Sequence, residues 1–263
     1  MRMLLALCLL MLSGLAQAAI KTQEIPYQST DGTKMIGYYA YDDAIKGPRP
    51  GVIVVHEFWG LNDYAKRRAR DLAGLGYSAL AIDMYGDGKN TEHPKDAMAF
   101  MQEALKDSAV ASARFKAGLD LLKQQPQTDP NKIAAIGYCF GGGVVLNAAR
   151  QGLPLLGVVS FHGALATTTP ATPGSVKAKI LVEHGAMDSM ITAENVTAFK
   201  AEMDKAGADY QFVSLAGAKH GFTNPDADRL SHGDHGGPDI GYNKAADESS
   251  WADMQAFFKK IFG

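Results

Sequence analysis

A cysteine set among glycines is the most specific chemical signal in the chain. It lies in Gly137-Tyr138-Cys139-Phe140-Gly141, between a predicted strand and a predicted helix. The pattern is the G-x-S-x-G nucleophile elbow, with cysteine in the nucleophile position. Such a sharp turn needs small residues two positions before and after the nucleophile, because larger side chains would collide. The N–H groups that begin the following helix favour the thiolate form of Cys139.

The same glycines could instead begin a phosphate-binding loop. Gly141 and Gly143 start a G-x-G pattern, but Leu146 stands where the third glycine of a dinucleotide-binding loop belongs. The sequence therefore favours the nucleophile elbow over a nucleotide site.

A nucleophile of this kind needs a base and an acid that orients the base. In these sheets the chain order is nucleophile, acid, histidine. Asp188 and His220 follow Cys139 in that order, each just past a predicted strand. Open α/β sheets place their sites at the carboxyl ends of strands. A single Asp could be a helix cap and a single His a surface residue, but the order of both favours catalysis.

Other acidic and histidine residues compete for these roles. His56 and Glu57 end a predicted strand at the same sheet edge, and His162 follows another strand. A short cluster that could bind a metal ion consists of His232, Asp234 and His235. Zinc sites usually need a third or fourth ligand at a set spacing. We therefore expect neither a metal nor a cofactor.

The elements that must position these residues alternate between strands and helices. Apolar, β-branched runs predict strands within 22–42 and at 52–55, 77–83, 132–138, 155–160, 179–183 and 210–215. Helical spacing predicts helices at 62–74, 95–106, 108–124, 141–151 and 193–205, and a last helix with Trp251, Met254, Phe258 and Ile261 on one side. This alternation predicts an α/β fold, a mostly parallel sheet with helices on both faces. The segment 221–244, rich in Gly, Asp and His, is expected to be a long loop.

The first 18 residues are expected to lie outside this fold. Residues 1–18 carry Arg2, an apolar stretch and the small-residue site Ala16-Gln17-Ala18, which is the layout of a secretory signal peptide. A membrane anchor is the alternative, but the apolar run is shorter than the roughly 20 residues needed to span a bilayer. We expect export to the periplasm or the medium, and one domain over 19–263. Cleavage would remove Cys8 and leave Cys139 without a disulfide partner.

Composition excludes several classes of protein. Hydrophobic residues make up 46% and charged residues 21% of the chain, as in globular proteins rather than disordered ones. The formal net charge is -2 and no basic block stands out, so we expect no nucleic-acid partner.

These features together resemble the dienelactone hydrolase family, which has the α/β-hydrolase fold. The resemblance covers roughly residues 25–262. It rests on His56–Asn62, on Gly137–Gly142, on Asp188 and His220, and on Phe222–Pro225 after the histidine. A cysteine in the elbow is specific, because most relatives use serine.

The resemblance implies acyl transfer through a thioester. Cys139 would attack a carbonyl carbon as a thiolate, and His220, held by Asp188, would transfer protons. The backbone N–H groups of Phe58 and Phe140 would form the oxyanion hole. The expected substrate is a small ester or lactone; the sequence predicts no oligomeric state.

The resemblance also gives Glu57 a role, that of accepting the thiol proton when substrate arrives. A purely structural alternative for Glu57 is a helix cap or an ion pair with Arg67. The family's substrate-binding arginines are missing here, because 85–89 and 221–223 contain none. We therefore expect a reshaped pocket that prefers neutral substrates. Its walls are expected to include Trp59, Tyr85 and Phe222.

Two other functions stay open from the residues alone. Cys139 could serve as a redox-active thiol, although the chain offers no resolving cysteine. The protein could also be a binding protein that kept the fold and lost the chemistry, although a complete Cys, Asp and His set counts against it.

Overall fold

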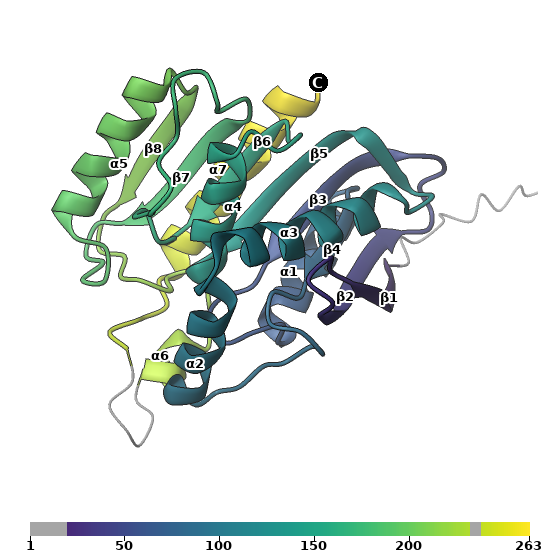
Figure 1. Ribbon diagram of the computed structural model, residues 1–263, viewed down its shortest axis with the longest axis horizontal. Helices are drawn as coiled ribbons and strands as arrows, with labels where there is room; N and C mark the ends of the chain where they lie inside the picture. The colour runs from purple at the N-terminus through teal and green to yellow at the C-terminus, as the bar shows by residue number, and fades with distance from the viewer. Residues whose placement is uncertain (1–19, 232–237) are drawn as a thin grey trace, which may run out of the picture.

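A computed structural model describes the protein over residues 20–231 and 238–263 (Figure 1). The expected signal peptide at 1–18 and the cluster of His232, Asp234 and His235 lie outside these residues. Both therefore stay predictions.

An eight-stranded sheet forms the centre, in the order β1-β2-β4-β3-β5-β6-β7-β8. β1 and β2 pair antiparallel, as do β2 and β4, and the pairs from β4 to β8 are parallel. The strands are β1 (Ile20–Gln28), β2 (Lys34–Asp42), β3 (Arg49–Val55), β4 (Ser78–Ile82), β5 (Thr128–Tyr138), β6 (Gly157–Phe161), β7 (Lys179–Gly185) and β8 (Tyr210–Leu215). The predicted mostly parallel sheet is confirmed.

Helices cover both faces of the sheet (Figure 1). They are α1 (Asp63–Gly74), α2 (Pro94–Leu105), α3 (Ser108–Lys123), α4 (Phe140–Arg150), α5 (Ala193–Ala206), α6 (Ala227–Ser231) and α7 (Lys244–Phe262). Leu72 of α1 and Phe258 of α7 are buried in one core cluster. Phe115 of α3, Val145 of α4 and Phe199 of α5 belong to the other. The predicted α/β architecture is therefore confirmed.

The strand β3 shows why its sequence is apolar without alternation. Val52 and Val54 pack into the core on the α1 and α7 side. Ile53 and Val55 pack into the core on the opposite side. A strand covered on both faces needs apolar residues at every position. Directly before α1, the Asn62 side chain accepts a hydrogen bond from the Ala65 N–H, as an N-cap residue does.

The expected long loop at 221–244 is partly helical, so that prediction was wrong in part. It contains α6, and Ile240 forms an isolated β-bridge with His220. The Asn224 side chain accepts a hydrogen bond from the Asp226 N–H at 3.0 Å and so starts the turn into α6. A five-residue helix is too short to show a hydrophobic repeat in sequence.

Candidate active site

Cys139 occupies a strained turn between β5 and α4. Its backbone has φ 54° and ψ -116°, a region that non-glycine residues rarely adopt and that is typical of functional sites. A Cβ atom at Gly137 would lie 2.0 Å from the Gly141 carbonyl oxygen, and one at Gly141 would lie 2.3 Å from that of Val55. The glycines of the elbow are therefore required by close backbone contacts, as the sequence indicated.

Asp188 and His220 meet although 32 positions separate them. The His220 Nδ1 atom donates to Asp188 Oδ2 at 2.8 Å, and both side chains are buried. The other carboxylate oxygen accepts from the N–H groups of Met190 and Ile191 at 2.9 and 3.1 Å. These bonds fix the carboxylate, so Asp188 can hold the imidazole ring in one orientation.

His220 is polarised by its two neighbours. The His220 Nε2 atom makes no hydrogen bond of normal geometry within the described residues. Cys139 is nevertheless close enough to affect the pKa of the ring. Burial disfavours the charged ring, but the interactions of the ring with Cys139 and Asp188 outweigh this and raise the pKa of His220 to about 10. The arrangement therefore places His220 where it can stabilise negative charge that develops on the Cys139 sulfur.

A cavity of about 230 Å³ opens onto the cysteine and the histidine. Its walls are mainly aromatic and aliphatic, and no Arg or Lys lines it. The lining residues are Glu57, Phe58, Trp59, Pro94, Met98, Met101, Cys139, Met190, His220, Gly221, Pro238 and Ile240. Lys89 is the only cationic residue in the segment 85–89, where the family has one of its arginines. It does not line the cavity.

Of the three predicted wall residues, only Trp59 lines the cavity. Tyr85 is buried behind the wall, where its hydroxyl donates to the Phe58 carbonyl oxygen at 3.0 Å. Phe222 is fully buried with its ring edge-on to His162. Tyr85 and Phe222 therefore lie behind the cavity wall and support it. Each side chain contacts other protein groups and does not face the cavity.

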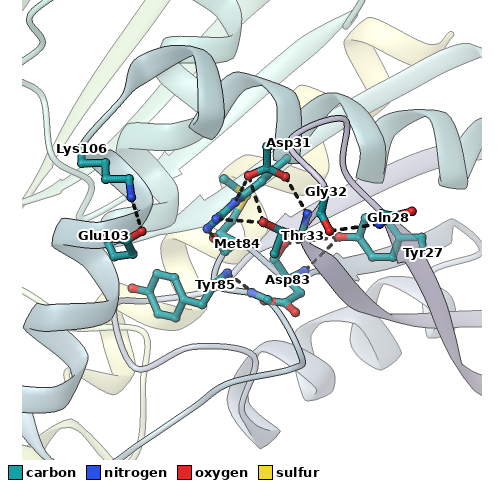
Figure 2. A network of polar contacts seen from close by, with 12 residues as sticks. Tyr27, Gln28, Asp31, Gly32, Thr33, Asp83, Met84, Tyr85, Glu103 and Lys106 are labelled. Carbon is teal, nitrogen blue, oxygen red and sulfur yellow. Dashed lines mark hydrogen bonds and ion pairs between the residues drawn. The ribbon is translucent and has the colours of Figure 1, made fainter.

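The loop after β4 holds Tyr85 in place through a dense polar network (Figure 2). The Asp83 carboxylate accepts from the backbone N–H groups of Tyr85, Gly86 and Gly88, each at 2.8 Å. Arg114 donates to the Met84 carbonyl oxygen at 2.8 Å. This loop therefore fixes Tyr85, and through it the backbone at Phe58.

Glu57 is buried at the cavity wall, and its carboxylate is hydrogen-bonded. Asn224 Nδ2 donates to Glu57 Oε2 at 2.7 Å. Burial raises the pKa of Glu57 to about 7, although this hydrogen bond and the charge of His220 pull the pKa the other way. No ion pair with Arg67 forms among the described residues; the Arg67 guanidinium lies over the Tyr64 ring instead.

The two competing histidines take different places. His56 lies behind the site, where its Nδ1 atom donates to the Glu57 carbonyl oxygen at 2.6 Å and its Nε2 atom accepts from the Met84 N–H at 3.2 Å. His162 lies directly beside the elbow and hydrogen-bonds the backbone of Cys139 at 3.1 Å.

The sequence missed the residues that brace the site from behind. They are Tyr64, Arg68, Thr223 and Asn224. The resemblance of Phe222–Pro225 to the family pointed to this segment, but not to what its side chains bind. Within residues 20–231 and 238–263, no group of three His, Cys, Asp or Glu is arranged to hold a metal ion. No described helix is long and apolar enough to span a bilayer.

Comparison with known proteins agrees with this geometry. The profile of the dienelactone hydrolase family matches residues 35–262. A relative from Saccharolobus solfataricus named carboxymethylenebutenolidase is 28% identical, with 91% of this chain and 98% of that protein covered. Protein usf of Aquifex pyrophilus is also 28% identical, with 88% and 95% covered.

Solved structures give the same assignment. The crystal structure of a dienelactone hydrolase-like promiscuous phosphotriesterase from metagenomic libraries has a TM-score of 0.84 and 38% identity to this chain. The match covers 93% of this chain and 100% of that one. The chain therefore belongs to the dienelactone hydrolase family and is a hydrolase of the ester- and lactone-cleaving type.

Proposed function

We propose that the protein hydrolyses neutral esters or lactones through Cys139, His220 and Asp188, with a thioester intermediate. One observation carries this proposal: a hydrogen-bonded His–Asp pair and a cysteine on a strained elbow face the same small cavity. A nucleophile, a base and a group that orients the base are the parts that covalent acyl transfer needs.

The proposed reaction has two halves. The Cys139 thiolate attacks the carbonyl carbon, and the backbone N–H groups of Phe58 and Phe140 stabilise the oxyanion. His220 gives its proton to the departing alkoxide, which leaves as an alcohol. Water then attacks the thioester and loses a proton to His220; the acid is released and the thiolate is regenerated. For a lactone, the alcohol and the acid are two ends of one molecule.

Glu57 is proposed to accept the thiol proton when substrate arrives. Its carboxylate lines the same cavity as Cys139. A pKa of about 7 suits a base that works near neutral pH. This step would keep the resting thiol less reactive toward oxidants.

The cavity favours neutral substrates. A substrate carboxylate would enter walls that contain no Arg or Lys, and an unpaired charge in a dry site costs several kcal/mol. We therefore expect kcat/KM for an anionic dienelactone to fall well below that for matched neutral esters and lactones. The reverse ranking would contradict the proposal.

Neutral phosphotriesters are a second candidate class of substrate. The relative described as a promiscuous phosphotriesterase is 38% identical over nearly the whole chain. A phosphotriester carries no charge, so the same apolar cavity offers it no electrostatic penalty. A comparison of p-nitrophenyl acetate with a neutral p-nitrophenyl dialkyl phosphate would rank the two classes.

Rapid quench followed by intact-mass measurement tests the thioester. An activated p-nitrophenyl ester should add one acyl group to the protein, and a thiol alkylator should prevent this. The adduct should be absent in Cys139→Ala. A Cys139→Ala variant with full turnover would place the nucleophile elsewhere.

The same measurement separates the two other functions. A redox-active thiol protein would gain oxygen from peroxide but no acyl group from the ester. A binding protein that had lost the chemistry would show neither change.

Export remains a separate proposal. The arrangement of residues 1–18 supports cleavage after Ala18. N-terminal sequencing of protein from a secreting host should begin at Ala19. A retained Met1 in the exported fraction would contradict it.

A further inference from the structure

His162 lies at the centre of a buried polar network directly behind the nucleophile. Its side chain is completely buried, and its backbone has φ 39°. A histidine with positive φ is uncommon. Such strain persists only where the surroundings over-determine the conformation, and it clusters at functional sites. Cys139 is strained in the same sense, so two strained residues contact each other at the elbow.

The two ring nitrogens of His162 link two separate segments. Nδ1 accepts from the Cys139 N–H at 3.1 Å, and that N–H is shared with the Phe161 carbonyl oxygen at 3.1 Å. Nε2 lies 2.8 Å from Thr223 Oγ1. Because Nδ1 accepts, the neutral ring carries its proton on Nε2 and donates to the Thr223 hydroxyl.

Thr223 belongs to the segment that carries the base, three residues after His220. Its hydroxyl lies 2.6 Å from the Tyr64 hydroxyl, which accepts from Arg68 Nε at 3.3 Å. Arg68 Nη2 donates to the Thr223 carbonyl oxygen at 2.9 Å and also pairs with Asp247 of α7. We call His162, Thr223, Tyr64 and Arg68 the rear network. It anchors the His220 segment to α1 and α7.

The rear network also requires a neutral His162. The ring centroids of His162 and His220 are 5.1 Å apart. Burial lowers the pKa of His162 well below its usual range, and the charge of His220 lowers it further. A neutral His162 does not oppose the imidazolium form of His220.

We propose that His162 is a positioning residue that ties the backbone of Cys139 to the segment carrying His220. The inference rests on the proposed thioester mechanism. His162 does not line the cavity, so it acts on the alignment of nucleophile and base rather than on substrate binding. Loss of the link should therefore lower kcat and leave KM nearly unchanged.

Two substitutions break the link at different ends. His162→Asn keeps an acceptor near the Cys139 N–H and tolerates positive φ, but it is too short to reach Thr223. Thr223→Val keeps the shape of the side chain and removes the hydroxyl. Thr223→Ser keeps the hydroxyl and is the matched control.

Activity is measured on protein that elutes as one folded species from size-exclusion chromatography and has the circular dichroism spectrum of the unmodified protein, so that misfolded protein is not counted. We expect kcat to fall about tenfold to a hundredfold in each broken variant, the size expected for a small misalignment of reacting groups. KM should stay within about twofold, and Thr223→Ser should restore kcat. The double variant should lose little more than the worse single variant, because both remove one link.

The rate of Cys139 alkylation at a fixed pH supplies a readout that a purely structural role would not change. Alkylation should be slower in both broken variants, because His220 is less well placed to stabilise negative charge on the sulfur. Lower melting temperatures with unchanged kcat and unchanged alkylation rates in the folded fraction would overturn the inference. If His162→Asn does not fold, the comparison of Thr223→Val with Thr223→Ser decides alone.

Failure of this inference can be told from failure of the proposed function. If the unmodified protein forms no acyl adduct, the thioester mechanism itself is wrong. If it forms the adduct and both broken variants form it at the same rate, only the role of His162 is wrong.

Discussion

The two sides of Cys139 are built from opposite chemistry. In front lies a cavity walled by groups such as Trp59, Met98 and Met190, with no Arg or Lys. Behind lies the rear network, in which buried polar groups hydrogen-bond one another. Apolar walls can select a substrate but hold it loosely, whereas a satisfied polar network fixes atoms in place. We infer that the front determines which substrate binds and the rear determines how fast it reacts.

The largest effect is expected where the two sides meet, at the pair of His220 and Asp188. Asp188→Asn would remove the charge that orients the imidazole and favour the wrong tautomer. We expect kcat for a p-nitrophenyl ester to fall by about 10⁴, as in other triads, with KM little changed. Asp129→Asn, at the start of β5 and far from the elbow, is the matched control. Near-normal turnover in Asp188→Asn would mean that Asp188 only shapes the loop.

The next effect is expected at Glu57, which lines the front cavity and is held by Asn224. Glu57→Gln keeps the shape and removes the base. We expect kcat/KM to fall by about 10²–10³, in line with the loss of a general base, with little change in melting temperature. Melting at a lower temperature with normal turnover would assign Glu57 a structural role only.

The pH profile sharpens this prediction. The proposed base works only when ionised, and burial raises the pKa of Glu57 to about 7. Activity should therefore fall as the pH drops below about 7, and Glu57→Gln should lack this acid limb. Asn224→Leu removes the hydrogen bond that opposes the rise, so its acid limb should move to higher pH.

The sequence predicted the front of the site better than the rear. The Gly–x–Cys–x–Gly pattern and the order of Asp188 and His220 are local signals, and strand ends bring them to one edge of the sheet. The absence of the family's substrate-binding arginines could also be predicted, because the segments 85–89 and 221–223 contain none. Glu57 was predicted as a base, but its partner Asn224 lies 167 positions away and was missed.

The rear network could not be predicted from sequence, for a physical reason. Tyr64 and Thr223 are 159 positions apart, and neither residue type indicates a partner by itself. His162 was noticed only as a histidine after a strand. The short helix α6 was missed because its five residues give no hydrophobic repeat. Local patterns predict elements, whereas contacts between distant loops depend on how those elements pack.

A smaller effect is expected from adding a charge to the front. Met190 lines the cavity and is 46% exposed, whereas Met187 is 59% exposed and does not line it. Met190→Arg should raise the ratio of kcat/KM for an anionic lactone over a neutral one by about threefold to tenfold, since a partly exposed ion pair is weak. Met187→Arg is the matched control. An equal rise in both variants would point to the overall charge of the surface rather than to the cavity.

The smallest effect on activity is expected at Glu183, which contrasts with the rear network because it is buried without a partner. Neither carboxylate oxygen has a hydrogen-bond partner among the described residues. Burial raises the pKa of Glu183 from 4.5 to about 8, with a contribution from Asp253. Below pH 4.5 the carboxyl is neutral in both the folded and the unfolded chain, so its burial costs no ionisation energy.

Between pH 4.5 and about 8 the unfolded chain loses this proton while the folded protein keeps it. The contribution of Glu183 to the free energy of unfolding should therefore be most favourable at acid pH and fall across this window, by up to roughly 4–5 kcal/mol. Glu183→Gln resembles the neutral carboxyl and cannot ionise. Its melting temperature should match the unmodified protein near pH 4.5 and exceed it by several degrees at pH 8, with kcat unchanged. Glu248→Gln, on the exposed face of α7, should show no such trend. A difference in melting temperature that does not vary with pH would mean that the Glu183 carboxyl is paired or solvated in the folded protein. Buried polar groups outside the rear network would then also have hydrogen-bond partners.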